Sequence, residues 1–291
     1  LGRTEHYLAA ASFAPQYFYR NFTIPKRTGG RREIRAPYLS LLECQRWIND
    51  NILSALSPHA CATGYVTGRS IRDHASPHVD AGFVLTIDLE NFFPTISFSR
   101  VISIFRGLGY SGQVSTSLAK LCCLDNVLPQ GAPTSPSLSN IVCKRLDEKL
   151  ERFAIESGLR YTRYVDDMCF SGGEIKKHTL DEIEKIVSSE GFRTNKSKTH
   201  LHAPRSNLKL VTGVNVALGK MSLPKSYKRA ISTDLFHIEK YGLRSHLAKR
   251  KIRDPNYIEA LVGKVGYWLF IEPENKRAQH YKQVLAQFVN I

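Results

Sequence analysis

The residues best suited to catalysis in this sequence are three aspartates, Asp88, Asp166 and Asp167. Asp88 follows the short apolar run 83–87, and the other two stand side by side between strand-like runs. Three carboxylates brought together repel one another, and Mg²⁺, which prefers oxygen ligands, is the natural cation to neutralise them. Two such ions activate an attacking hydroxyl and stabilise the leaving oxygen of an in-line displacement at phosphorus. The pattern favours metal-dependent nucleotidyl transfer, although aspartates also serve as helix caps and turn formers.

Strand-like runs on either side of the aspartates supply the elements that must position them. The run 83–87 is typical of a buried strand that delivers a carboxylate at its C-terminal end. The runs 159–165 and 168–171 are separated only by the aspartate pair, which predicts a tight β-hairpin with both carboxylates at its tip. Helical patterns follow these runs or separate them, at 99–108, 111–121, 138–155 and 180–189. Together they predict the split βαβ arrangement of an α+β palm.

The rest of the chain divides into two regions. The N-terminal part contains a basic stretch at 26–35, which we expect to be a hairpin, and a helix at 41–56. A further strand is predicted at 208–216, and the pattern after it is helical to the end. We therefore expect a first region at 1–220 and a small helical region at 221–291.

The charge of the chain points to a polyanionic partner. Its 291 residues include 41 Lys plus Arg against 26 Asp plus Glu, a formal net charge of +15. Basic residues of the C-terminal region, Lys228 and Arg229 among them, are candidates for RNA contact, because binding to phosphates releases counterions. A solvated basic face is the alternative. Apolar runs such as 267–271 are far below the roughly 20 residues that span a bilayer, so we expect no membrane partner.

The six cysteines show no Cys-x-x-Cys pair, and we expect no metal-ligand spacing with a histidine and no disulfide framework. They are interpreted as reduced thiols of the core. No signal peptide is recognised, and the sequence opens at Leu1 rather than Met, so residues upstream can be missing. We expect the protein to be cytoplasmic.

Three motifs surround the aspartates in a fixed order: IDLENFF at 87–93, LPQGAP at 128–133 and YVDD at 164–167. In this order they resemble the motifs of the reverse transcriptases, a combination far more specific than any one of them alone. The resemblance implies a right-hand polymerase with fingers and a ferredoxin-like palm in 1–220 and a small helical thumb in 221–291. Such an enzyme copies RNA into DNA from dNTPs, with two Mg²⁺ ions bound by the three aspartates.

Two further motifs sharpen the resemblance toward the bacterial retron reverse transcriptases. Val211, Thr212 and Gly213 match the VTG signature of that branch, and the run from His74 to His78 resembles its NAxxH signature. His74 stands where the pattern has Asn, whereas His78 is retained. The resemblance covers nearly the whole chain and implies that these residues contact RNA.

Membership of the retron branch implies more than single residues can show. The template is then a cognate structured noncoding RNA, primed from one of its own 2′-hydroxyls, and the product is a branched RNA–DNA molecule, msDNA. An effector protein held in check by enzyme and product, as part of an antiphage system, is the implied partner. The rival interpretations are a group II intron-like reverse transcriptase and a nucleoprotein scaffold without turnover.

The resemblance assigns nucleotide-binding roles to five more residues. Phe93 is the expected aromatic gate that excludes a ribose 2′-hydroxyl, and its alternative is a core side chain. Gln130 and Gly131 are expected to form the floor beneath the nucleotide, unless they form an ordinary loop. Lys198 is expected to face the triphosphate and donate a proton to pyrophosphate, and Arg32 to contact template or triphosphate.

Overall fold

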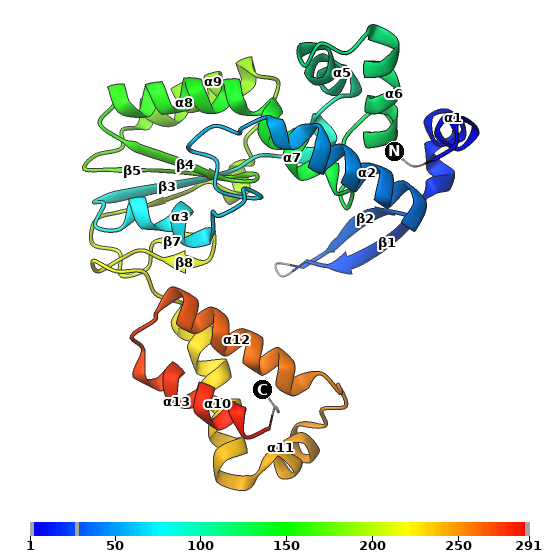
Figure 1. The fold of residues 1–291 in the computed structure, drawn as a ribbon. Helices are drawn as coiled ribbons and strands as arrows, with labels where there is room; N and C mark the ends of the chain where they lie inside the picture. The colour runs from blue at the N-terminus through cyan, green and yellow to red at the C-terminus, as the bar shows by residue number, and fades with distance from the viewer. Residues whose placement is uncertain (1–2, 27–28, 289–291) are drawn as a thin grey trace. The chain divides into compact units, whose positions relative to one another are not determined.

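The computed structural model describes residues 3–26 and 29–288 of the chain, which folds into two compact units (Figure 1). Their bounds are 1–74 with 83–201 for the first unit and 75–82 with 202–291 for the second. The second unit therefore takes up sequence from residue 202 onward, before the expected boundary after residue 220. The division into fingers, palm and thumb stays a prediction.

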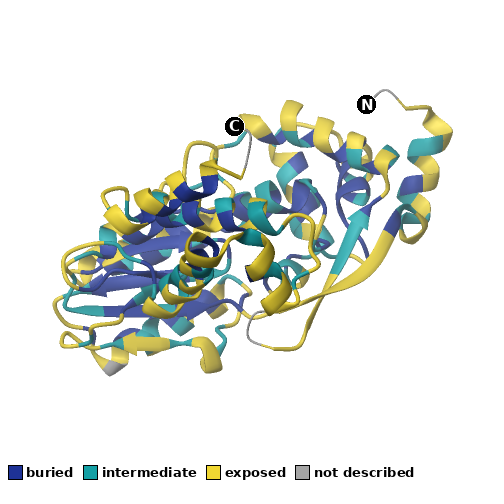
Figure 2. Cartoon of the chain, turned by 90° about the horizontal axis from the view of Figure 1, so that it is seen from below, coloured by how far each residue is buried: buried dark blue, intermediate teal, exposed yellow. Residues whose placement is uncertain are grey.

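A four-stranded sheet forms the centre of the first unit. Its strands are β3 (Phe83–Asp88), β4 (Arg160–Tyr164), β5 (Asp167–Gly172) and β6 (His200–His202), in the spatial order β4-β5-β3-β6. β5 pairs antiparallel with both β3 and β4. Most residues of β3 and β5 are buried, as the apolar runs predict, and the strands appear dark blue in Figure 2.

Two amphipathic helices cover one side of this sheet, α8 (Lys144–Glu156) and α9 (Lys177–Ser189) (Figure 1). Leu146, Leu150 and Ala154 of α8 recur every fourth residue and are buried. The single helix expected at 138–155 is wrong, because α7 (Thr134–Val142) ends before Cys143, whose ψ of −4° turns the chain before α8 begins. The apolar pattern continues through this turn, so periodicity alone does not reveal it.

The remaining elements of the first unit lie beside the sheet and pack mostly on one another (Figure 1). The expected basic hairpin is present as β1 and β2, and its turn includes residues 27–28, which lie outside the described residues. The helices expected at 41–56, 99–108 and 111–121 are also present, with shifted ends. The bounds are α1 (Glu5–Phe13), η1 (Pro15–Phe18), β1 (Tyr19–Pro25), β2 (Arg31–Pro37), α2 (Leu39–Asn51), η2 (Leu53–Ala55), α3 (Ile71–Ala75), α4 (Phe92–Thr95), α5 (Phe98–Gly107), α6 (Gly112–Cys122) and η4 (Lys196–Lys198).

The second unit contains a short hairpin and, after it, the helices α10 to α13, in agreement with the helical pattern expected there. The strand expected at 208–216 is wrong: Thr212 and Gly213 have φ values of +44° and +87°, the positive pair of a type I′ turn, which folds this stretch back on itself. The bounds are η3 (Ser76–His78), β7 (Leu210–Val211), β8 (Val214–Asn215), α10 (Lys225–Tyr241), α11 (Leu243–Arg250), α12 (Tyr257–Ile271) and α13 (Lys276–Ala286). Among the described residues, no helix combines the length and the hydropathy required of a membrane span.

A buried ion pair joins α8 to the strand that leads into the aspartate hairpin. The side chains of Arg163 and Asp147 are both fully buried, and the guanidinium donates to the two carboxylate oxygens at 2.8 and 2.6 Å. Nη1 of Arg163 also donates to the carbonyl of Val165 at 2.9 Å and to Asn140 Oδ1 at 3.1 Å. The Tyr161 hydroxyl donates to Asp147 at 2.8 Å. Because each charge has several partners, the network can hold the hairpin from inside the core.

Replacement of Asp147 tests this network. Asp147→Asn leaves the Arg163 charge buried without its counterion, so we expect a loss of about 3 kcal/mol in the free energy of unfolding. Glu148→Gln, at an exposed position of the same helix, is the control and should change it by less than about 0.5 kcal/mol. Urea denaturation measures both. Equal stability of the two variants would show that the ion pair does not hold the hairpin.

Candidate active site

The three aspartates, far apart in sequence, lie together at one end of the sheet. Asp88 is the last residue of β3 and pairs in register with Asp167, the first residue of β5. The amide of Leu89 donates to the carbonyl of Asp166 at 2.9 Å, which fixes the end of β3 against the hairpin turn. The Asp88 residue is only 7% exposed, and Asp166 and Asp167 are partly buried. The predicted convergence is therefore present.

The hairpin differs in one detail from its expected form. Tyr164 pairs with Asp167, so the two-residue turn consists of Val165 and Asp166, and Asp167 already belongs to β5. Val165 has a φ of +62°, an unfavourable conformation for a β-branched residue. Gly64 packs against this turn so closely that a Cβ there would lie 2.7 Å from the Val165 side chain. The strained turn is thus packed against Gly64, and the hydrogen bond from Arg163 to the carbonyl of Val165 holds it in place.

Negative charge accumulates at this site and is only partly compensated. Burial, and then the charge of Asp88, raise the pKa of Asp166, while Lys198 and Arg32 act in the opposite direction. Lys198 Nζ donates to Asp88 Oδ1 at 2.8 Å, and this hydrogen bond raises the pKa of the lysine. Lys198 is about half exposed, so solvent screens the pair. A lysine and a distant arginine do not neutralise three carboxylates, and the oxygen donors fit hard divalent cations.

The two adjacent phenylalanines of the first motif have different environments. Phe92 is 4% exposed and packs on Phe192 at 5.8 Å between ring centroids, so it belongs to the core. Phe93 is only partly buried and contacts the core through the ring of Phe92, at 5.4 Å. Phe93 is therefore the member of the pair that can present an edge to a ligand, and its role as a gate stays a prediction.

The loop with Gln130 and Gly131 packs against β2. The carbonyl of Gln130 accepts a hydrogen bond from the amide of Arg35 at 2.9 Å. Gly131 has a φ of +129°, and a Cβ there would lie 2.9 Å from the carbonyl oxygen of Arg35. The close backbone approach that requires glycine is thus made by β2, whereas an approach to substrate stays a prediction. Arg32, on the same strand, is exposed.

The residues of the two retron motifs are largely internal. His74 is 1% exposed, and its Nδ1 lies 2.8 Å from the hydroxyl of Thr162 on β4, which also donates to the carbonyl of His74. His78 and Val211 are each 0% exposed. Thr212 and Gly213 form the turn between β7 and β8. These residues have evident structural roles within their units, and their contact with RNA remains a prediction.

Lys228 and Arg229 lie on α10 beside a cavity of about 850 Å³. Lys228 Nζ bonds to Glu272 Oε1 at 2.9 Å, so part of its charge is compensated within the protein. Arg229 is exposed, and Lys225, Lys276 and Arg277 line the same cavity. The cavity therefore retains an excess of positive charge suited to a phosphate backbone.

Three residues that hold the site were missed in the sequence. Arg163 interrupts an otherwise uncharged strand interior beside YVDD, a signal that a buried counterion is required. Nothing in the sequence shows that Asp147 is that counterion. Gly64 lies in a Gly- and Thr-containing stretch that looks like any surface loop, and its contact with Val165 emerges only from the fold.

Comparison with known proteins shows which family this chain is similar to. Residues 24–234 match the family described as reverse transcriptase (RNA-dependent DNA polymerase). The chain is 37% identical over 230 residues to the retron Ec86 reverse transcriptase of Escherichia coli, covering 78% of this chain and 72% of that protein. It is 30% identical over 290 residues to the retron Mx162 enzyme of Myxococcus xanthus, covering 89% of this chain and 59% of that protein. Against the Mx65 enzyme of the same organism it is 38% identical over 220 residues, or 68% of this chain and 51% of that one.

Among solved structures, a telomerase from Candida albicans aligns with a TM-score of 0.48 and 11% identity, over 92% of this chain and 63% of that one. The family match and the Ec86 similarity establish that this chain belongs to the reverse transcriptases. It is therefore an RNA-directed DNA polymerase, and its fold is of the α+β class. Within that family it is a bacterial retron reverse transcriptase. Polymerases of this family bind an RNA template and use divalent metal ions. The predictions of enzyme class and branch are confirmed.

The accumulated charge predicts that Asp166 lowers the stability of the metal-free chain. The pKa of Asp166 is raised in the folded chain, so without metal the folded state loses stability as pH rises from the ordinary value of about 3.9 through the raised one. Asp166→Asn removes this loss. We expect it to melt a few degrees above the wild type at neutral pH in a chelating buffer, while Asp181→Asn, at an exposed position, should not. Thermal unfolding followed by circular dichroism measures the difference, and an Asn variant no more stable than the wild type would contradict the account.

Proposed function

We propose that Asp88, Asp166 and Asp167 bind two Mg²⁺ ions and catalyse the addition of dNTPs to a primer hydroxyl. The register of β3 and β5 supports this most directly, because it joins three carboxylates in a partly buried site. Bound Mg²⁺ would lower the pKa of the primer hydroxyl and stabilise charge on the leaving pyrophosphate. Asp88 and Asp166 are the proposed principal ligands, and Asp167 supports them.

The neighbouring side chains have proposed roles in nucleotide binding. Lys198 is protonated and within reach of the carboxylates, so it can face the triphosphate and donate a proton to pyrophosphate. In doing so it would release its bond to Asp88, freeing that oxygen for a cation. Phe93, partly buried beside the core, is the proposed gate against a 2′-hydroxyl. Gln130 and Gly131 are proposed to form the nucleotide floor and Arg32 to contact template or triphosphate.

We further propose that the template is a cognate structured noncoding RNA and that the product is branched msDNA. The retron identity of the relatives and the two retron motifs support this proposal. The net charge of +15 and the basic cavity beside Arg229 are suited to RNA. We propose that His74, His78 and Val211 shape RNA recognition from within the core of their respective units, and that Thr212 and Gly213, at the partly exposed turn, contact the RNA.

An effector protein restrained by enzyme and msDNA, in a cytoplasmic antiphage system, is the proposed biological setting. All six cysteines are free and buried, as expected of a reducing compartment.

To test the proposal, the chain is expressed together with the genomic segment that neighbours its gene. The nucleic acid that copurifies with the chain is then sequenced. We expect one predominant RNA joined to DNA through a 2′–5′ branch, which a debranching enzyme separates into two strands. The matched control is the Asp166→Ala/Asp167→Ala double variant, which should retain the RNA and contain no DNA.

Three results would contradict the proposal. Equal extension of arbitrary primed RNAs, with no branch, would favour a group II intron-like enzyme. DNA in the double variant would show that Asp166 and Asp167 are not required for catalysis. A wild-type chain that binds RNA but makes no DNA would be a nucleoprotein scaffold.

A further inference from the structure

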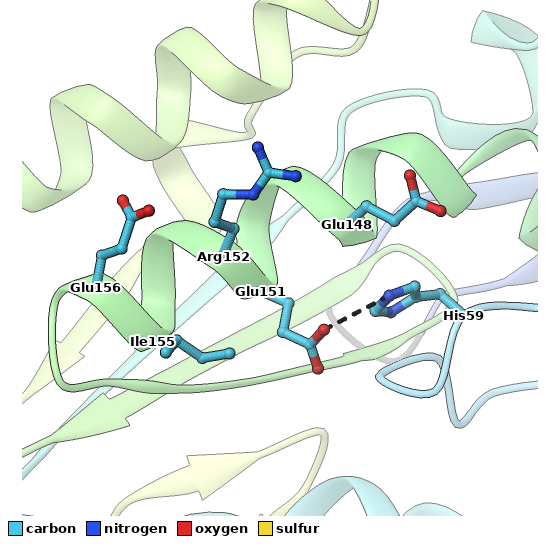
Figure 3. A pocket seen from close by; sticks show the side chains of 6 residues that line it. All are labelled: His59, Glu148, Glu151, Arg152, Ile155 and Glu156. Carbon is cyan, nitrogen blue, oxygen red and sulfur yellow. Dashed lines mark ion pairs between the residues drawn. The ribbon is translucent and has the colours of Figure 1, made fainter.

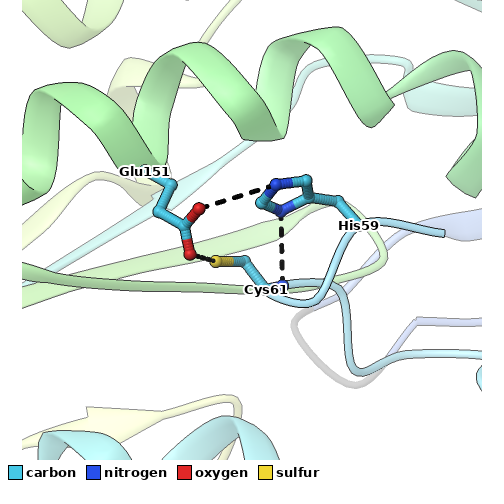
Figure 4. Close-up of side chains that lie close together, drawn as sticks. All are labelled: His59, Cys61 and Glu151. Atoms are coloured by element: carbon cyan, nitrogen blue, oxygen red, sulfur yellow. Dashed lines mark hydrogen bonds and ion pairs between the residues drawn. The ribbon is translucent and has the colours of Figure 1, made fainter.

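A second cluster of metal-ligating side chains lies in the first unit, apart from the three aspartates. It consists of His59, Cys61 and Glu151 (Figure 4). The expectation that no histidine stands at ligand spacing from a cysteine is wrong here, because His59 precedes Cys61 by two positions and α8 supplies the third donor. Nitrogen, sulfur and oxygen donors together match the ligand set of zinc rather than of Mg²⁺.

The donor atoms are already close to the spacing that zinc requires. Cys61 Sγ donates to Glu151 Oε1 at 2.9 Å, His59 Nε2 lies 3.6 Å from Glu151 Oε2, and one donor atom from each residue lies within 4.8 Å of the other two. In a tetrahedral zinc site with bonds of 2.0–2.3 Å, neighbouring ligand atoms are about 3.5 Å apart. Side-chain rotations of modest size would therefore be sufficient.

Binding through Nε2 of His59 moves the imidazole proton to Nδ1. That nitrogen now accepts a hydrogen bond from the amide of Cys61 at 3.4 Å, a long and weak contact whose loss costs little. The Cys61 thiol now donates a hydrogen bond to Glu151, and its proton is released to solvent when the thiolate binds the cation. Both changes are confined to the cluster itself.

The cluster leaves one side open for a fourth ligand. Cys61 is 8% exposed, whereas the side chain of Glu151 is 39% exposed and borders a cavity of about 370 Å³. The end groups of Glu148, Arg152 and Glu156, which line the same cavity, point away from the pair formed by His59 and Glu151 (Figure 3). The Arg152 charge therefore does not occupy the position that a cation would take, and water can complete the coordination.

The backbone that carries the ligands is held by the same network as the catalytic hairpin. The carbonyl of Cys61 accepts a hydrogen bond from the amide of Arg163 at 2.9 Å, and Thr63 donates to the carbonyl of Arg163 at 2.8 Å. Glu151 lies one turn of α8 after Asp147, the partner of the Arg163 side chain. The ligands thus come from two segments whose separation is already fixed, which lowers the entropic cost of binding.

We propose that His59, Cys61 and Glu151 bind one zinc ion, with water as the fourth ligand. The ion links the 59–63 segment to α8 next to Arg163 and so stiffens the support of the YVDD hairpin. The site is separate from the Mg²⁺ site in position and in ligand chemistry. It does not depend on the proposed RNA or on catalysis.

Cobalt(II), a spectroscopic substitute for zinc, tests the proposal. The purified chain is stripped with a chelator and titrated with Co²⁺ in excess Mg²⁺, which fills the aspartate site. We expect one Co²⁺ per chain, with a thiolate-to-cobalt charge-transfer band and the intense visible bands of a four-coordinate ion, both abolished by added Zn²⁺. Cys61→Ser should remove the charge-transfer band, and Glu151→Gln should weaken binding at least tenfold.

Glu148→Gln and Cys44→Ser are the matched controls. Glu148 is a glutamate of the same helix as Glu151, and Cys44 is a buried cysteine outside the cluster. Both should bind Co²⁺ like the wild type. A second measurement covers the case in which Cys61→Ser does not fold: Zn²⁺ should raise the melting temperature of the wild type and of Glu148→Gln, but not of Glu151→Gln. Absence of the charge-transfer band in the wild type, its persistence in folded Cys61→Ser, or an equal zinc effect on the two glutamate variants would overturn the proposal.

Discussion

Repulsion between three carboxylates at the end of one sheet is the constraint around which this protein is organised. The pairing of Asp88 with Asp167 brings the charges together, and burial makes the charge on Asp166 unfavourable in the metal-free chain. The hydrogen bond from Lys198 to Asp88 compensates only part of this negative charge. A site of this kind is poised to bind divalent cations because bound metal removes an energetic penalty that the fold has already incurred.

The fold keeps the charges together because buried contacts hold the hairpin turn in place. Val165 adopts a left-handed conformation that disfavours its branched side chain, and the strain persists because neighbouring contacts determine it. Arg163 holds the Val165 carbonyl, Asp147 holds Arg163, and the missing side chain of Gly64 leaves room for the turn. These residues touch no substrate in the proposed mechanism, yet they fix where Asp166 can lie.

The convergence of the three aspartates can be predicted from the sequence, whereas the residues that support them cannot. The three aspartates are evident because each borders a strand-like run and because the motifs occur in a fixed order. The break at Cys143 and the turn at Thr212 and Gly213 were missed, because both lie within patterns that continue on either side. The partnership of Arg163 with Asp147, and of Glu151 with Cys61, depends on how α8 packs on the sheet. No local pattern contains that information, although an arginine inside a strand signals that a partner exists.

The most direct test of the central claim is anomalous diffraction from crystals of the chain soaked with Mn²⁺ and a non-hydrolysable dNTP analogue, since Mn²⁺ substitutes for Mg²⁺ and scatters anomalously. Two peaks about 3.5–4 Å apart, each within bonding distance of Asp88 or Asp166 oxygens, are the predicted result. A nucleotide bound without any manganese at these aspartates, or manganese bound only elsewhere on the chain, would contradict it.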